Sequence, residues 1–324
     1  MPIFKIHHIT KYEYDRPVRE SVNEMKIFPF ACLEQETLSH ELHISGMPEV
    51  QVFSDYWGNK TGVFNVLPLH NKLIIESKLV VRTTAPSQLR INFHHGFDDL
   101  AHEVNSDIKL IELSEADAIS NQNAVDEIIE KIVGDKKSVA IVVERCAEYI
   151  FKYFSYIKGI TDVETTVDEI LEHRSGVCQD FAHLILQVLR SLKIPSRYVS
   201  GYICPKDKEM RGEGATHAWV EAYIPNYGWL GLDPTNNCVV NDGHVRLATG
   251  RDFADCTPVK GTYKGSGDHK LEVLVEIHDG NSNKKFEKNG APKFSYQTKN
   301  PGEPVNSYRY FIEAQQKQQQ QQQQ

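Results

Sequence analysis

The chain has 324 residues, 40% of them hydrophobic and 25% charged, enough apolar sequence for the cores of two ordinary domains. Its formal net charge of -8 would repel the phosphates of nucleic acids and of anionic membrane surfaces, so we expect neither nucleic acid nor membrane as a partner. The sequence opens without a signal-peptide pattern and has no apolar run long enough to cross a bilayer, which predicts a cytoplasmic protein.

The first 85 or so residues alternate in the manner of antiparallel strands. The apolar side chains on one side of a period-two run are those of Leu73, Ile75, Leu79 and Val81. Turn signals such as Trp57-Gly58-Asn59 separate runs of this kind. We expect an N-terminal antiparallel β domain over residues 1–100.

Helical patterns follow and mark the change to a second domain. They cover residues 124–133 and 138–157, whereas the acidic stretch before them is only weakly periodic. The second pattern has apolar residues at spacings of three and four, as one buried helix face requires. These residues are Val139, Val142, Cys146, Tyr149, Ile150, Tyr153 and Ile157. We place the domain boundary near residue 100, so that the second domain covers residues 101–280.

The next two predicted helices lead to a cysteine. Thr166 and Glu169 have the spacing of a capping box, which starts a short helix that ends near Gly176. From Cys178 onwards, apolar residues again keep helical spacing until Pro195 stops the pattern. Cys178 is therefore predicted in the first turn of an amphipathic helix.

Strand-like segments follow this helix, at residues 196–203, 215–224, 229–233 and 271–277. A helix followed by antiparallel strands is an α+β arrangement. Beyond Gly280 the chain is polar and of low complexity, and it ends in a glutamine tract. Such sequence cannot offset the entropy of ordering, so residues 281–324 are expected to form a disordered tail.

A thiol at position 178 is a candidate nucleophile. The six cysteines lack a CxxC pair and the dense spacing of a disulfide scaffold, so reduced thiols are expected. Lowering a thiol pKa from about 8.5 to about 6 takes about 3.4 kcal/mol, whereas a helix dipole typically supplies only about 0.3 to 1 kcal/mol. A nearby imidazolium must supply the rest. His217 is the best candidate, because a predicted strand would hold it rigidly.

Asp233 is a candidate to orient this imidazole. It ends the next predicted strand, beyond a turn at residues 225–228 that can close a hairpin, and a carboxylate there would fix the tautomer of His217. The sequence does not fix the hairpin register, and a slip of one residue would turn Asp233 to the other face. Singly, the three residues also have structural interpretations: a buried thiol, a hydrogen-bonded strand histidine, and a turn aspartate before a proline.

A family resemblance rests on four segments, which match in order and spacing. They are Gly176 to His183, Arg197 to Tyr202, Thr216 to Val220 and Gly228 to Thr235. These segments closely resemble the core of bacterial transglutaminase-like proteins, and Gly250 to Asp255 continue the match. Ile9 to Tyr14 and Asp55 to Asn59 look like the β domain that precedes this core in that family. The resemblance covers roughly residues 1 to 280.

What the resemblance implies is a papain-like core, in which a nucleophile helix packs on an antiparallel sheet. It aligns the catalytic Cys, His and Asp of the family with Cys178, His217 and Asp233. Tyr156 could donate to an oxyanion, although its expected role is in the core. Trp219 and Trp229 could shield the His217–Asp233 pair from water.

The expected activity is hydrolysis of an amide or peptide bond through a thioester acyl-enzyme, with a peptide, a protein or a small amide as substrate. Protein-glutamine transamidation is an alternative, less favoured because the sequence shows no second, amine-binding site. Another alternative is a non-catalytic binding module that retains the fold. No cofactor and no metal site are expected, because HExxH and GxSxG do not occur and histidine pairs such as His7-His8 are typical of a solvated surface.

Overall fold

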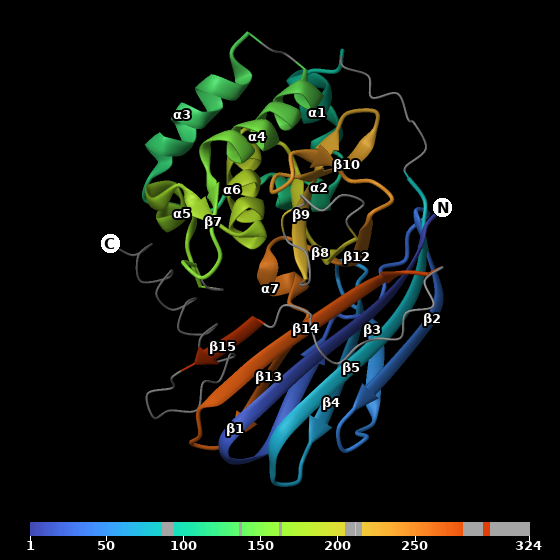
Figure 1. Ribbon diagram of the computed structural model, residues 1–324. Coiled ribbons are helices and arrows are strands. Elements are labelled where there is room, and N and C mark those ends of the chain that lie inside the picture. The colour runs from blue at the N-terminus through green and yellow to red at the C-terminus, as the bar shows by residue number, and fades with distance from the viewer. Residues whose placement is uncertain are drawn as a thin grey trace.

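The computed structural model describes residues 1–85, 94–135, 138–161, 164–204, 211 and 216–280, together with the backbone of residues 294–298. Figure 1 shows a large β-sheet at one end of the molecule, a smaller sheet in the middle, and helices on the far side of the smaller sheet. This is the α+β arrangement predicted from the sequence. No helix within the described ranges is long and apolar enough to cross a membrane.

The large sheet is organised around one long strand, β1 (Ile3–Met25). The first half of β1 pairs with β5 (His70–Thr83) and β14 (His269–Asp279), and its second half pairs with β4 (Lys60–Val66) and β13 (Val259–Lys264). β2 (Gln35–Ile44) pairs with β5, and β3 (Val50–Ser54) pairs with β4. All of these pairs are antiparallel, which confirms the β region expected at the N-terminus.

Local details of this sheet also follow the sequence. The side chains predicted to share the buried face of β5 are all at most 2% exposed: Leu73, Ile75, Leu79 and Val81. At the predicted turn, Gly58 has φ +84°, which glycine adopts without strain. Asp55 Oδ1 stabilises this turn by accepting hydrogen bonds from the amides of Trp57 at 3.0 Å and Asn59 at 2.8 Å.

The strand predicted at residues 271–277 forms, but it joins the large sheet instead of the core strands beside which it was expected. It is part of β14, which pairs with β1 from Tyr14 opposite His269 to Phe4 opposite Asp279. The placement was wrong because local alternation identifies a strand but not its partner. Within the expected tail, the backbone of Phe294–Thr298 forms β15 beside β14. The rest of the tail, with its glutamine tract, lies outside the described residues.

Two short helices, α1 (Phe97–Val104) and α2 (Ile108–Ser114), occupy the stretch that shows only weak periodicity. α3 (Gln122–Val133) matches its prediction. α4 (Val139–Tyr153) ends four residues earlier than predicted, and Ile157 lies outside it, 43% exposed. The reason is a backbone pairing: β6 (Ser155–Tyr156) runs parallel to β7 (Ser175–Gly176), with hydrogen bonds from Ser155 N to Arg174 O at 2.9 Å and from Ile157 N to Gly176 O at 3.0 Å.

The two helices before and after β7 begin where the sequence predicts. Thr166 caps α5 (Val167–His173) by accepting from Glu169 N at 3.3 Å, and the Glu169 carboxylate accepts from Thr166 N at 2.7 Å. α5 ends with Arg174 in the left-handed region, slightly before the predicted end. α6 (Cys178–Ser191) starts at Cys178 and buries its apolar residues, including Phe181 and Leu184.

The small sheet separates these helices from the large sheet. Its strand order is β11 (Cys238–Val239), β10 (Gly228–Asp233), β9 (His217–Ile224), β8 (Ser196–Ile203) and β12 (His244–Gly250), and α7 (Phe253–Cys256) follows. Alternate residues of β9, such as Ala218 and Val220, pack in one core with α6. On the other side, Tyr202 and Val245 share a core with Ile6 of the large sheet. One layer therefore positions both the helix and the strands that carry the predicted site.

Candidate active site

Cys178 is fixed at the first position of α6 by the side chain of Asp180. Oδ2 of this buried carboxylate accepts from Val177 N at 2.7 Å and from Thr161 Oγ1 at 2.6 Å, which ties down the chain just before the helix. Gly176 makes room for it, since a Cβ there would lie 2.6 Å from the same oxygen. The thiol is half-buried.

The start of α6 offers positive charge and free donors to this thiol. The first hydrogen bond within the helix runs from Phe181 N to Val177 O, at 3.0 Å. The amides of Cys178 and Gln179 therefore have no acceptor within the helix. They form the positive end of its dipole, where a thiolate, or the oxyanion of a reacting carbonyl, would be stabilised.

His217 and Asp233 meet because of the β9–β10 hairpin. Ile224 pairs with Gly228 and Val220 with Leu232, so the next residue, Asp233, falls on the same face as His217. The register left open by the sequence thus places both side chains together. His217 Nε2 donates to Asp233 Oδ2 at 2.8 Å, and both side chains are fully buried.

Each member of this pair favours the charged form of the other. Burial lowers the pKa of His217, but the Asp233 carboxylate and the Cys178 side chain outweigh burial and raise the pKa to about 10. Burial raises the pKa of Asp233, yet His217 and then His244 hold this pKa well below its usual range. The pair is therefore an imidazolium and a carboxylate near neutral pH.

The remaining ring nitrogen of His217 is left for Cys178. Nδ1 is buried and has no hydrogen-bond partner among the described residues, while Cys178 is close enough to contribute to the raised pKa of the ring. Because Nε2 is engaged by Asp233, Nδ1 is the ring nitrogen left to exchange a proton with a thiol. The structure thus brings together all three residues that the sequence singled out.

Asp233 is held by more donors than the sequence indicates. Its Oδ1 accepts from the amides of Thr235 at 2.9 Å and Asn236 at 3.2 Å. Its Oδ2 accepts, besides His217, the Asn236 side-chain amide at 2.7 Å and His244 Nε2 at 3.5 Å. The turn contacts of Asp233 and its contact with His217 coexist, because each uses mainly one carboxylate oxygen. Sequence reasoning missed Asn236 and His244, since neither belongs to a pattern that points to the site.

The aromatic residues considered as shields or donors have different surroundings. Trp219 is fully buried, with its ring 6.2 Å from that of His217, so it is the tryptophan placed to shield the pair from water. Trp229 lies elsewhere, stacked under the guanidinium of Arg197 at 4.2 Å, so it does not shield the pair. Burial and the nearby Cys178 raise the pKa of Tyr156, so its hydroxyl stays protonated and able to donate.

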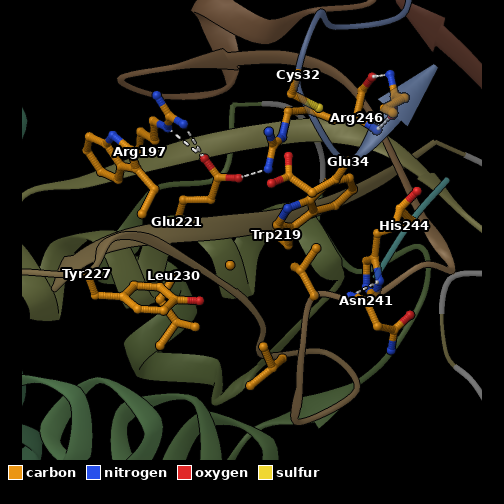
Figure 2. A pocket seen from close by; sticks show the side chains of 16 residues that line it. Cys32, Glu34, Arg197, Trp219, Glu221, Tyr227, Leu230, Asn241, His244 and Arg246 are labelled. Carbon is orange, nitrogen blue, oxygen red and sulfur yellow. Dashed lines mark hydrogen bonds and ion pairs between the residues drawn. The ribbon is translucent and has the colours of Figure 1, made fainter. Parts of the chain in front are cut away.

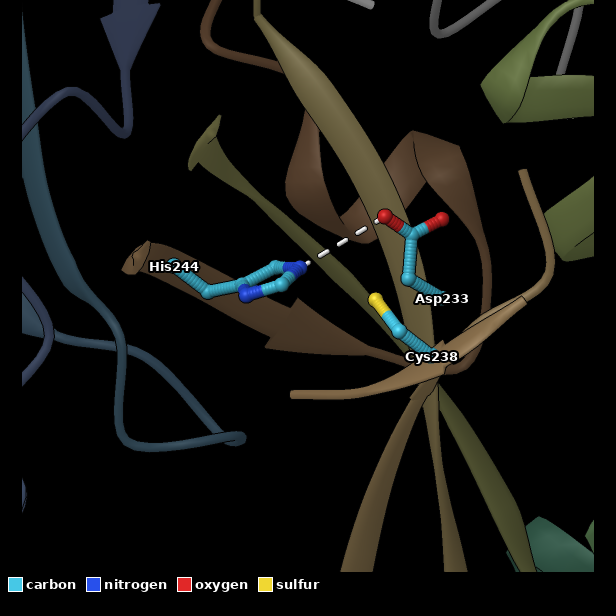
Figure 3. Close-up of side chains that lie close together, drawn as sticks. All are labelled: Asp233, Cys238 and His244. Atoms are coloured by element: carbon cyan, nitrogen blue, oxygen red, sulfur yellow. Dashed lines mark hydrogen bonds and ion pairs between the residues drawn. The ribbon is translucent and has the colours of Figure 1, made fainter. Parts of the chain in front are cut away.

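Asp233, Cys238 and His244 have ligand atoms within 4.8 Å of one another, a spacing that could hold a metal ion (Figure 3). The hydrogen bonds oppose this use. His244 Nδ1 accepts from the amide of Asn241 at 3.3 Å, so Nε2 carries the proton and faces Asp233 as a donor. Burial, and then Asp233, raise the pKa of Cys238 to about 12, which keeps this thiol protonated. The cluster is better described as a hydrogen-bonded support of Asp233.

A cavity of about 550 Å³ lies between the small sheet and the large one (Figure 2). Glu221 is buried in its wall and pairs with Arg197 at 2.6 Å and with Arg246. Trp219 and His244 also line it. Cys178, His217 and Asp233 are not among its lining residues.

The charged pair predicts a pH-dependent stability. A histidine with a raised pKa contributes stability fully below its unfolded pKa of about 6.5, and the contribution is lost as the pH rises toward about 10. The destabilisation caused by His217→Gln should therefore be larger at about pH 6 than at about pH 9. Urea unfolding of both proteins across this range measures it, and a difference in unfolding free energy that stays constant would contradict the ion pair.

Comparison with known proteins agrees with this architecture. Residues 126–234 match the model of the transglutaminase-like superfamily, and residues 4–82 match that of the bacterial transglutaminase-like N-terminal region. An uncharacterized protein of Mycobacterium leprae is 33% identical over 278 residues, covering 84% of this chain and 97% of that protein. An uncharacterized protein of Mycobacterium tuberculosis is 30% identical over 296 residues, covering 85% of this chain and 92% of the other.

A solved structure supports the fold over nearly the whole chain. It belongs to a Cytophaga hutchinsonii protein provisionally assigned as a cysteine protease, with a TM-score of 0.66, 22% identity, and coverage of 92% of this chain and 98% of the other. The fold is thus α+β and papain-like, preceded by a β region. The chain belongs to the transglutaminase-like superfamily, which confirms the resemblance seen in the sequence.

Proposed function

We propose that the protein is a cysteine-dependent amide or peptide hydrolase, with Cys178 as nucleophile, His217 as general base and acid, and Asp233 as the residue that orients His217. The observation that carries the proposal is the buried hydrogen bond of 2.8 Å between His217 Nε2 and Asp233. It leaves the other ring nitrogen of His217, Nδ1, available to Cys178 at the N-terminus of α6. Burying two charges is costly, and a structural role alone does not require a thiol beside them.

The chemistry follows from this geometry. In the resting pair His217 Nδ1 already holds the proton taken from Cys178, so Cys178 Sγ attacks the substrate carbonyl carbon as a thiolate. The resulting oxyanion is stabilised at the first-turn amides of α6. When the C–N bond breaks, His217 returns the proton to the leaving amine, and a thioester remains on Cys178. Water then attacks the thioester, His217 accepts its proton, and the carboxylic acid leaves as the S–C bond breaks.

Protein-glutamine transamidation is a second candidate, in which an amine replaces water in the last step. One observation favours it: a Pseudomonas aeruginosa protein-glutamine gamma-glutamyltransferase is 31% identical over 118 residues, covering 34% of this chain and 17% of that protein. Hydrolysis stays the leading proposal, because water is always available to the acyl-enzyme unless the site excludes it.

Incubation with glutamine-containing peptides and a labelled primary amine distinguishes the two reactions. We expect ammonia and glutamate-containing peptide as the main products, with little label incorporated. Efficient incorporation of the amine would replace the hydrolase proposal with the transamidase. Cys178→Ala serves as the blank for both reactions.

A thiol-reactive probe tests the further alternative, a non-catalytic binding module. At about pH 6, a free thiol is almost wholly protonated, whereas a thiolate–imidazolium pair reacts. Cys178 should therefore be alkylated much faster than Cys32, which is also half-buried and whose pKa burial raises. Equal rates, resolved by mass spectrometry of the modified peptides, would favour the binding module.

A further inference from the structure

We propose that His244 is a positioning residue, which holds the Asp233 carboxylate in the orientation that His217 needs. The inference deepens the proposed function and rests on it. His244 begins β12, at the opposite edge of the small sheet from β10 and β11, so a non-local part of the fold supplies it.

The hydrogen bonds of His244 define its direction. Nδ1 accepts from Asn241 N at 3.3 Å, which leaves the proton on Nε2. Nε2 then donates to Asp233 Oδ2 at 3.5 Å, the same oxygen that accepts from His217 Nε2 at 2.8 Å. Both imidazoles therefore donate a hydrogen bond to the same carboxylate oxygen, Asp233 Oδ2. His244 also contributes to the lowered pKa of Asp233, as a donor to the charged form should.

Packing fixes the ring of His244 in this place. Its side chain is buried and meets the Trp219 indole edge-on, with ring centroids 5.3 Å apart and planes at 76°. Trp219 cannot shift easily, because it fills space left by Gly201, where a Cβ would lie 2.5 Å from the indole. Trp219 also flanks His217, so one indole spaces both imidazoles around Asp233. The arrangement leaves the carboxylate little freedom to rotate away from His217.

The length of the His244–Asp233 bond limits the expected effect. At 3.5 Å it is a weak hydrogen bond, whereas the 2.7 Å bond from Asn236 restrains the same oxygen strongly. Loss of His244 should therefore lower the rate at which Cys178 reacts about three- to tenfold, far less than loss of Asp233 itself.

The test compares His244→Leu, which removes the donor, with His244→Gln, whose side-chain amide can still donate to Asp233. In the full-length protein, the rate at which iodoacetamide alkylates Cys178 is measured at about pH 6 by mass spectrometry, with Cys32 as an internal reference. We expect His244→Leu to lower the alkylation rate of Cys178 about three- to tenfold, whereas the rate in His244→Gln should stay within about twofold of the wild type. The alkylation rate of Cys32 should be unchanged in both variants.

His8 supplies a matched control for loss of a buried, hydrogen-bonded histidine. Its side chain bonds Tyr202 Oη at 2.8 Å and Thr10 Oγ1 at 3.1 Å. His8→Leu should lower the melting temperature of the protein without lowering the alkylation rate of Cys178. Normal alkylation in folded His244→Leu overturns the inference, and so does equal slowing in His244→Leu and His244→Gln, which would indicate a structural role. Wild-type Cys178 that reacts no faster than Cys32 would instead overturn the proposed function.

Discussion

Cys178→Ala is expected to abolish turnover outright and to change the free energy of unfolding by less than about 1 kcal/mol. The thiol is half-buried at the first position of α6, where alanine suits a helix well, so little packing is lost. The chemistry disappears completely, because alanine has no nucleophilic atom to form the thioester. Release of the amine product and thermal unfolding are the two measurements.

Cys32→Ala is the matched control for this substitution. It removes another half-buried thiol, one that lines the cavity between the two sheets, and it should retain wild-type turnover. Residual turnover in Cys178→Ala beyond that of a mock preparation would mean that the nucleophile lies elsewhere. If Cys178→Ala loses its fold together with its activity, Cys178→Ser tests the assignment instead. The serine hydroxyl nearly keeps the volume of the thiol but is not ionised by an imidazole at neutral pH.

The starts of α5 and α6 were predictable because their signals are local. The capping box of Thr166 and Glu169 and the apolar spacing after Cys178 lie within a few residues of the features they predict. The same holds for the alternation in β5. The end of α4 was not predictable in this way, because the pairing of Ser155 with Arg174 crosses α5 in sequence.

The candidate site was only partly predictable for a related reason. His217 and Asp233 belong to one hairpin, and the order of strands and turn suggested their proximity without fixing the register. In the structure, the turn between the two strands sets this register, and Asn226 and Gly228 in the turn adopt positive φ values of 58° and 93°. His244 reaches Asp233 from the other edge of the sheet, and no local pattern in the sequence could indicate this contact.

Asp233→Asn is expected to slow acylation of Cys178 on the order of 10³- to 10⁴-fold, as loss of a tautomer-fixing carboxylate does in catalytic triads. An asparagine amide facing Nε2 would make His217 carry its proton on Nδ1. That proton points to the thiol, so the ring could no longer accept one from Cys178. The measurements are the acylation rate with an activated ester and the alkylation rate of Cys178 at about pH 6.

Stability must be followed separately, because Asp233 also shapes its turn. Asparagine keeps an oxygen for the amides of Thr235 and Asn236, so Asp233→Asn should unfold closer to the wild type than Asp233→Ala, which strands buried donors and should cost about 3 to 5 kcal/mol. Asp55→Asn is the control, since Asp55 caps a similar turn in the large sheet without a histidine beside it. A folded Asp233→Asn protein with near wild-type acylation would remove Asp233 from the mechanism and leave a Cys178–His217 dyad.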